Sequence, residues 1–136
     1  MKALPVFLAV AIAAALSGCS VTANEASCRN FETAYNSVDL EAKAGAIGGA
    51  YGAALKLLAD RTESDAQSVA LGEVRRYMME VVIGQGRYAD AGTSRADGDY
   101  TVTDVRAELK DSFRGVAKAC NDSGHPISLK LDHPTP

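Results

Sequence analysis

The sequence predicts an all-α protein, an up-down-up-down bundle of four helices with a short extended C-terminal tail. Three observations support this fold class. Apolar residues recur every three or four positions in four separate stretches, which is the spacing of a helix face buried on one side. Capping patterns and glycines divide these stretches. The links between most of them are short, and short links favour antiparallel packing of neighbouring helices.

The first two helices are predicted between Thr22 and Asp60. Thr22-x-x-Glu25 is a capping box that begins the first helix, and Ser37 with Asp39 provides a break and a new N-cap. The second helix is expected over residues 40–60. The residues expected on the two buried faces are Cys28, Phe31, Tyr35 and Val38 in the first helix, and Leu40, Ala44, Ile47, Tyr51, Ala54 and Leu58 in the second.

The third helix is predicted to begin at the capping box Ser64-x-x-Gln67 and to end near Ile83, because Gly84 and Gly86 are natural stops. Residues 85–100 then form the longest connection. The residues expected on the buried face of this helix are Leu71, Val74, Met78 and Val81.

The fourth helix is expected to begin at Thr101 or Thr103 and to end near Asn121, before Gly124 and Pro126. Residues 127–131 alternate apolar and polar side chains, so they are expected to lie on the bundle as an extended segment. The residues expected on the buried face of the helix are Val102, Val105, Leu109, Phe113, Val116 and Cys120.

The N-terminus has the pattern of an export signal. Lys2 is followed by an uncharged run from Leu4 to Leu16, which is too short to span a bilayer. Leu16-Ser17-Gly18-Cys19 then resembles the lipobox of bacterial lipoproteins. The resemblance implies that the chain is cut before Cys19, that a diacylglycerol is joined to the Cys19 thiol, and that in many bacteria the new amine is acylated, typically with palmitate. Two or more acyl chains make a stable anchor.

The expected organisation is therefore a signal peptide at residues 1–18, a lipidated tether at 19–23, a helical domain at 24–124 and an extended tail at 125–136. The alternative is an ordinary secretory signal cut after Ala23, which would release a soluble protein. As a lipoprotein, the chain is expected on the outer face of the cell membrane or on the outer membrane. In a Gram-negative host, the lack of Asp at position 20 resembles lipoproteins sent to the outer membrane; in a Gram-positive cell the question does not arise.

The cysteine count agrees with this organisation. The chain has three cysteines, and lipidation of Cys19 leaves Cys28 and Cys120 as an even pair. In an up-down-up-down bundle the start of the first helix and the end of the fourth lie at the same end. The topology thus predicts a disulfide between Cys28 and Cys120, which in the chain-entropy model stabilises the fold by roughly 4 kcal/mol.

A glycine-rich segment lies within the predicted second helix. Gly45 with Gly49, and Gly48 with Gly52, form overlapping GxxxG pairs. Each glycine costs about 1 kcal/mol relative to Ala in a helix interior, which calls for a compensating contact. One interpretation is close helix packing inside the bundle. The other is a groove that binds a second copy or a partner. In this interpretation the glycine-rich stretch resembles the glycine-rich segments of some outer-membrane lipoproteins.

No metal or cofactor is expected. The spacing of the acidic residues of the long connection does not match an EF-hand, so a solvated loop is predicted; these residues are Asp90, Asp97, Asp99 and Asp104. His125 and His133 lie in the tail without a third nearby ligand, which makes a poor zinc site.

The sequence does not indicate an enzyme or a nucleic-acid-binding protein. It has no G-x-S-x-G nucleophile motif and no glycine-rich phosphate motif followed by GK[ST]. The net charge of −3 offers no basic surface for phosphates, and it gives no attraction to anionic lipid.

The function expected from these observations is a non-catalytic interaction or binding role of a membrane-anchored helical lipoprotein in the cell envelope. The partner is expected to be an envelope protein or a second copy of the chain. An alternative is a carrier of a small apolar ligand, with a cavity lined by Leu58, Met78, Met79 and Phe113. Two further alternatives are an envelope enzyme and a lipoprotein resembling those with which prophages exclude related phages, although no motif carries the latter resemblance.

Overall fold

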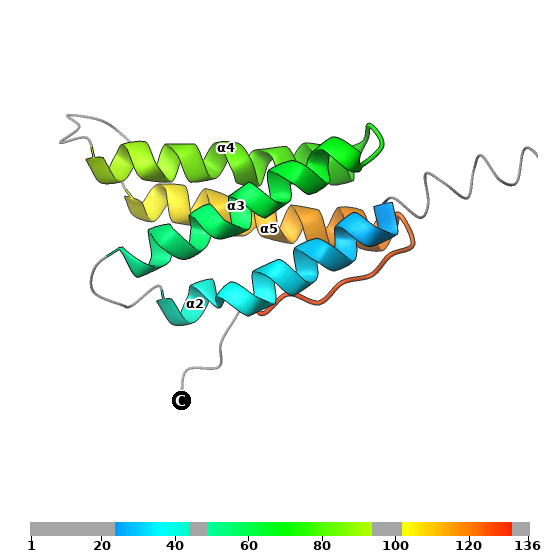
Figure 1. Cartoon of the computed structure of the whole chain (residues 1–136), viewed down its shortest axis with the longest axis horizontal. Helices are drawn as coiled ribbons and strands as arrows, with labels where there is room; N and C mark the ends of the chain where they lie inside the picture. The colour runs from blue at the N-terminus through cyan, green and yellow to red at the C-terminus, as the bar shows by residue number, and fades with distance from the viewer. Residues whose placement is uncertain (1–23, 44–48, 94–101, 132–136) are drawn as a thin grey trace, which may run out of the picture.

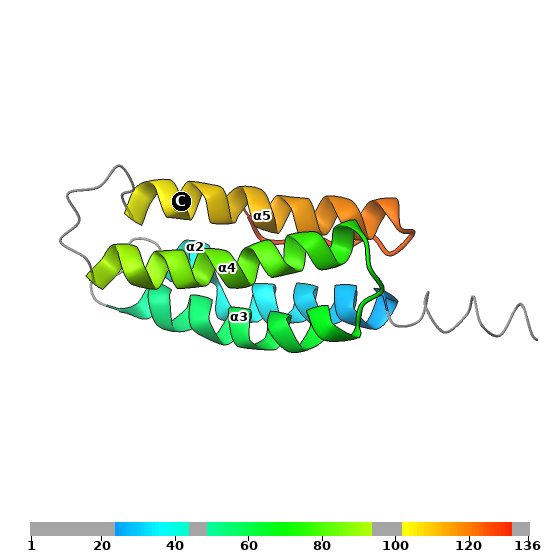
Figure 2. The same cartoon turned by 90° about the horizontal axis from the view of Figure 1, so that it is seen from above.

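The computed structural model describes residues 24–43, 49–93 and 102–131. Within these ranges every regular element is a helix and no residue is in a strand, which confirms the predicted all-α class. The helices lie side by side as a bundle (Figures 1 and 2). None of the described helices combines the length and the apolar character needed to cross a membrane.

The N-terminal helix covers residues 24–38 and is separated by Asp39 from the short helix α2, Leu40–Lys43. Asp39 has a φ of 49°, in the left-handed region that Asp tolerates better than most residues. The Lys43 ammonium group donates a hydrogen bond of 2.6 Å to the Val38 carbonyl oxygen at the end of the preceding helix. The break that the sequence predicts at Asp39 is therefore confirmed.

Helix α3 covers Ala50–Ser68, so the predicted boundary between a second helix ending near residue 60 and a third beginning at Ser64 is wrong. The helix continues because its buried face continues. Thr62 and Ala66 expose 1% and 0% of their surface. The Thr62 hydroxyl donates a hydrogen bond of 2.7 Å to the carbonyl oxygen of Leu58, which satisfies it inside the helix. Ala44 and Ile47 of the predicted second helix lie outside the described residues.

Helix α4 covers Glu73–Thr93 and passes through Gly84 and Gly86, which were predicted to be stops. Residues 85–93 are accordingly helical, whereas residues 94–101 of the predicted connection lie outside the described part. Leu71, predicted to be buried, precedes the helix and exposes 86% of its surface. The physical reason for the longer helix is close packing at Gly84, which is described below.

Helix α5 covers Val102–Asp122, close to the predicted bounds. The tail that follows has no regular structure up to residue 131, and its side chains alternate between half-buried and exposed. The Asn36 side chain of the N-terminal helix bonds to it twice. Its Nδ2 donates to the Ser128 carbonyl oxygen at 2.9 Å, and its Oδ1 accepts from the Lys130 N–H at 2.9 Å. The tail thus lies along the N-terminal helix, as Figure 1 shows in red.

One hydrophobic core joins all the long helices. Tyr35 of the N-terminal helix contacts Phe31 on its own helix and Phe113 of α5, with ring centroids 6.2 Å and 4.9 Å away. Both partners are buried, and the contact with Phe113 has an edge-on geometry that aromatic pairs favour. The buried face predicted for the N-terminal helix is therefore confirmed.

Candidate functional site at the disulfide end of the bundle

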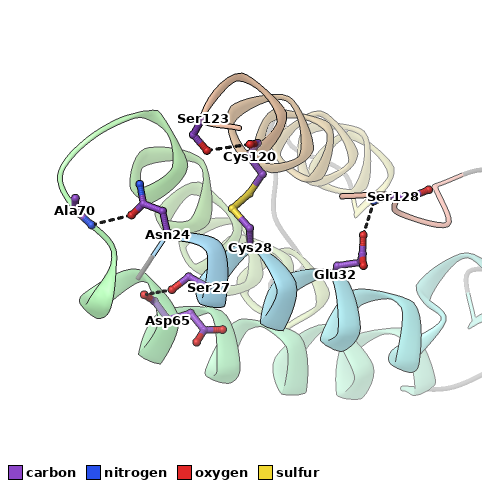
Figure 3. The surroundings of a disulfide bond; sticks show 9 residues. All are labelled: Asn24, Ser27, Cys28, Glu32, Asp65, Ala70, Cys120, Ser123 and Ser128. Atoms are coloured by element: carbon purple, nitrogen blue, oxygen red, sulfur yellow. Dashed lines mark hydrogen bonds between the residues drawn. A yellow bond between two sulfur atoms is a disulfide. The ribbon is translucent and has the colours of Figure 1, made fainter. Parts of the chain in front are cut away.

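A disulfide links the first turns of the N-terminal helix to the last turn of α5 (Figure 3). Cys28 and Cys120 are 92 residues apart in the chain, yet their Cα atoms are 6.0 Å apart. Both side chains are fully buried. The predicted pairing is confirmed, and it closes most of the folded chain into one loop. Cys19, the predicted lipid attachment site, precedes the described residues.

The end of α5 is fixed by a Schellman motif. Gly124 has a φ of +88°, the left-handed conformation that glycine adopts without a Cβ clash. The His125 N–H donates to the Cys120 carbonyl oxygen at 2.9 Å, and the Gly124 N–H donates to that of Asn121 at 3.0 Å. The Ser123 hydroxyl also donates to the Cys120 carbonyl oxygen, at 2.9 Å. This arrangement ends the helix two residues after Cys120 and turns the chain back toward the N-terminal helix.

Hydrogen bonds at the same end connect the N-terminal helix to α3 and to the turn that follows it (Figure 3). The Ser27 hydroxyl donates to the Asp65 carbonyl oxygen at 3.4 Å, and Asn30 Nδ2 donates to Asp65 Oδ1 at 3.2 Å. The Ala70 N–H donates to Asn24 Oδ1 at 3.3 Å. Burial raises the pKa of the Asp65 carboxyl, and the bond from Asn30 partly opposes that rise.

The glycine-rich segment is only partly within the described residues. Gly45 and Gly48 lie outside them. Gly49 precedes α3, is exposed and has no neighbour that a Cβ would meet. Gly52 lies inside α3, where a Cβ would be 3.3 Å from Tyr88 Cε1 of α4. Of the four glycines, Gly52 is thus placed in a helix–helix contact of the bundle.

Tyr88 belongs to a polar aromatic cluster that was not predicted from the sequence. The Tyr51 and Tyr88 rings have centroids 5.1 Å apart, and the Arg106 guanidinium carbon is 4.3 Å from the centroid of the Tyr51 ring. These residues belong to α3, α4 and α5. Burial raises the pKa of the Tyr51 hydroxyl, and the positive charge of Arg106 opposes the rise. Cation–π geometry of this kind holds helices together and requires no ligand.

The interface of α4 and α5 depends on two other glycines. A Cβ at Gly84 would lie 2.6 Å from Leu109 Cδ2, and one at Gly115 would overlap the Tyr77 ring. Beside these contacts lies an open surface groove of about 480 Å³. Its lining is Tyr77, Glu80, Ile83, Gly84, Arg87, Glu108, Leu109, Asp111, Ser112 and Gly115. The sequence pattern does not predict this groove, because it places the residues after Gly84 in a loop.

The residues that the sequence analysis places around a cavity for a small apolar ligand lie mostly in the packed core. Leu58 and Met78 expose none of their surface and Phe113 exposes 2%, while Met79 is half-buried against the same core. A small ligand would therefore have to displace core side chains to reach these residues.

Within the described ranges, no three His, Cys, Asp or Glu side chains are grouped closely enough to hold a metal ion. Asp90 and Asp104 lie in helices α4 and α5, so neither belongs to a loop. His125 is half-buried at the start of the tail. Asp97, Asp99 and His133 lie outside the described residues.

No protein-family model matches this chain, and neither a curated protein nor a solved structure matches it.

Proposed function

We propose that this protein is an exported lipoprotein, held on a membrane of the cell envelope by acyl chains on Cys19. The supporting observation is the pairing of Cys28 with Cys120, which leaves Cys19 as the third and last cysteine of the chain. Structural disulfides belong to oxidising compartments outside the cytoplasm. The residue left without a partner is the one that follows Leu16-Ser17-Gly18, the lipobox-like sequence.

The proposed organisation keeps the boundaries expected from the sequence. Residues 1–18 are removed, residues 19–23 form the lipidated tether, and residues 24–136 are the folded domain with its tail. Burial of acyl chains contributes about 0.8 kcal/mol per CH₂, which is ample for stable anchoring with two or more chains. The protein then acts on the outer face of the cell membrane or on the outer membrane.

The helices are proposed to follow an up-down-up-down path. Two features support this topology. Residues 69–72 form a short connection between α3 and α4, which favours antiparallel neighbours. The disulfide joins the beginning of the N-terminal helix to the end of α5, and an up-down-up-down bundle brings those two points to one end.

The role proposed for the anchored domain is non-catalytic binding of another envelope protein or of a second copy. Surface hydrophobes support a binding role: Ile83 lines the groove of α4 and α5 with 52% of its surface exposed. Leu57 exposes 56% and lines a second groove of about 480 Å³ beside α3. Burial of these exposed aliphatic side chains against a partner surface would be favourable.

The anchor is tested with cysteine variants of the full chain expressed in a bacterium that processes lipoproteins. Cys19→Ala should abolish incorporation of labelled palmitate and move the protein out of the detergent phase in phase partitioning. The matched control is Cys28→Ser with Cys120→Ser, which should keep both properties while losing the disulfide. Palmitate labelling that persists in Cys19→Ala would contradict the proposal.

The binding role is tested by a photo-crosslinking amino acid placed at Ile83 or Leu57 in living cells. A defined crosslinked product at one of these positions, with none at the exposed residue Glu63 of α3, is the expected result. If neither hydrophobic position yields a product that depends on light, the proposed contact surfaces are wrong.

A further inference from the structure

The turn between α3 and α4 presents an exposed hydrophobic tip. Leu71 exposes 86% of its surface, far more than Leu57 at 56% or Ile83 at 52%. No charged residue occurs from Ala66 to Gly72, so the tip carries no ionised side chain. A single exposed leucine is common on protein surfaces. What distinguishes Leu71 is its place in the fold.

The tip lies against the start of the described chain. The N–H of Ala70, the residue before Leu71, donates a hydrogen bond of 3.3 Å to Asn24 Oδ1 (Figure 3). Asn24 follows Cys19 by five residues. Five residues reach at most about 18 Å when fully extended. Helix α5 alone has 21 residues, which corresponds to about 31 Å. A lipid on Cys19 would therefore hold the Asn24 end, and with it the Leu71 tip, near the bilayer.

The distribution of charge also favours the approach of this end to a membrane. The chain has a net charge of −3, so an anionic membrane surface repels the molecule as a whole. Two acidic side chains of this part of the molecule take part in ion pairs, whereas the Asp65 carboxylate, directly before the uncharged stretch, accepts a hydrogen bond from Asn30. Glu73, at the start of α4, forms an ion pair of 2.7 Å with Arg76. Asp122, in the last turn of α5, forms one of 2.6 Å with Lys118. The tip itself therefore brings no ionised side chain to the lipid headgroups.

We propose that the Leu71 tip, residues 70–72, inserts into the interfacial layer of the bilayer that carries the acyl chains of Cys19. This inference rests on the proposed lipoprotein anchor and adds a second contact to it. The anchor fixes one point of the molecule, whereas the tip sets the orientation of the bundle, with the disulfide end toward the lipid. The grooves beside Leu57 and Ile83 then remain accessible to partners.

The experiment uses single-tryptophan variants, because the natural chain has no Trp. Leu71→Trp, Leu57→Trp and Ile83→Trp are each made in the full chain, purified in acylated form and reconstituted on phosphatidylcholine vesicles with brominated acyl chains. Leu57 and Ile83 lie in the middle of α3 and α4, so they serve as matched controls for the preference of Trp for membrane interfaces. Mass analysis of the N-terminal peptide reports acylation of Cys19 in the same samples.

The expected result is a blue-shifted emission for Leu71→Trp and a loss of intensity from bromine several-fold greater than in either control. If Cys19 is acylated and the Leu71→Trp variant is quenched no more than the controls, the inference is overturned while the anchor stands. If all three variants are quenched equally, the molecule lies flat on the membrane and the proposed orientation is wrong. If the N-terminal peptide carries no acyl group, the anchor and the inference fail together.

Discussion

Gly84 and Gly115 determine how closely α4 and α5 approach each other. A Cβ at Gly84 would meet the Leu109 side chain, and one at Gly115 would overlap the Tyr77 ring. Gly86 lies on the same helix as Gly84 and is exposed, and a Cβ added there would meet no neighbouring element within 4 Å. Glycine therefore permits helix packing at two of these positions and weakens the helix at the third.

Replacement of these glycines should have opposite effects. Gly115→Ala forces the Tyr77 ring to move and should lower the free energy of unfolding by about 1–3 kcal/mol, as overpacking does. Gly86→Ala should raise it by up to about 1 kcal/mol, because Ala has the higher helix propensity. Urea unfolding followed by circular dichroism measures both. Equal effects of the two substitutions would contradict the packing described for Gly115.

The Asp65 carboxyl should give stability a measurable pH dependence. Its pKa in the folded protein is raised above the ordinary value of 3.8 by burial. The folded state therefore binds this proton more readily than the unfolded state. The resulting stabilisation is complete below the unfolded pKa and is lost as the pH rises through the folded one.

Asp65→Asn removes this titration and keeps an oxygen that can accept the bond from Asn30. The variant should gain stability relative to the natural protein as the pH rises from about 3 to about 7, and urea unfolding across that range measures the difference. Glu63→Gln, on the exposed face of the same helix, controls for the loss of one negative charge. If the stability of Asp65→Asn relative to the natural protein fell as the pH rose, the pKa of Asp65 would not be raised in the folded state.

The tail behaves as an added element whose position depends on side chains of the N-terminal helix. Asn36 both donates to and accepts from the tail backbone, much as a neighbouring strand would. Glu32 accepts a further bond from the Ser128 N–H. Ile127, Leu129 and Leu131 pack against the core. The tail is thus held by both polar and apolar contacts.

Asn36→Ala should loosen the tail without unfolding the bundle. Loss of two exposed hydrogen bonds should cost about 1 kcal/mol and speed amide exchange at Lys130, whose N–H loses its acceptor. Trypsin should also cleave after Lys130 faster than in the natural protein. Thr33→Ala, at an exposed position of the same helix, is the control. An unchanged exchange rate at Lys130 would show that the apolar contacts alone hold the tail.

The elements differ in how much of them the sequence could predict. Helix α5 and the N-terminal helix have apolar faces with clear ends at Gly124 and Asp39, and these ends were predicted closely. The predicted start of the N-terminal helix at Thr22 lies outside the described residues. The boundary of α3 and α4 was not predicted closely. The buried positions in the second half of α3 include Thr62 and Ala66, which a search for large apolar residues overlooks. Ser64-x-x-Gln67 has the pattern of a capping box, yet it lies inside the helix.

The candidate site was predictable to the same uneven degree. The disulfide followed from the expected topology, because that topology brings Cys28 and Cys120 to one end. The cluster of Tyr51, Tyr88 and Arg106 did not follow, since it depends on how three helices are rotated about their axes. Spacing along the chain specifies which residues share a face, but it leaves that rotation undetermined.

At the level of the complete fold, the disulfide should dominate stability. Its two cysteines are 92 residues apart, and in the chain-entropy model closure of so long a loop stabilises the folded state by roughly 4 kcal/mol. Cys28→Ser with Cys120→Ser should lower the free energy of unfolding by about that amount, as measured in urea. Two thiols that react with an alkylating agent in the native, unreduced protein would show that the bond is absent.

The proposed attachment of the whole molecule to a membrane depends on the chemistry of Cys19. Its most direct test is the mass of the N-terminal peptide of the mature protein isolated from the membrane fraction of cells that make the full chain. The predicted result is a peptide that begins at Cys19 and carries a diacylglycerol. A mature protein that begins at Asn24, unmodified and recovered in the aqueous fraction, would contradict the proposed lipid anchor.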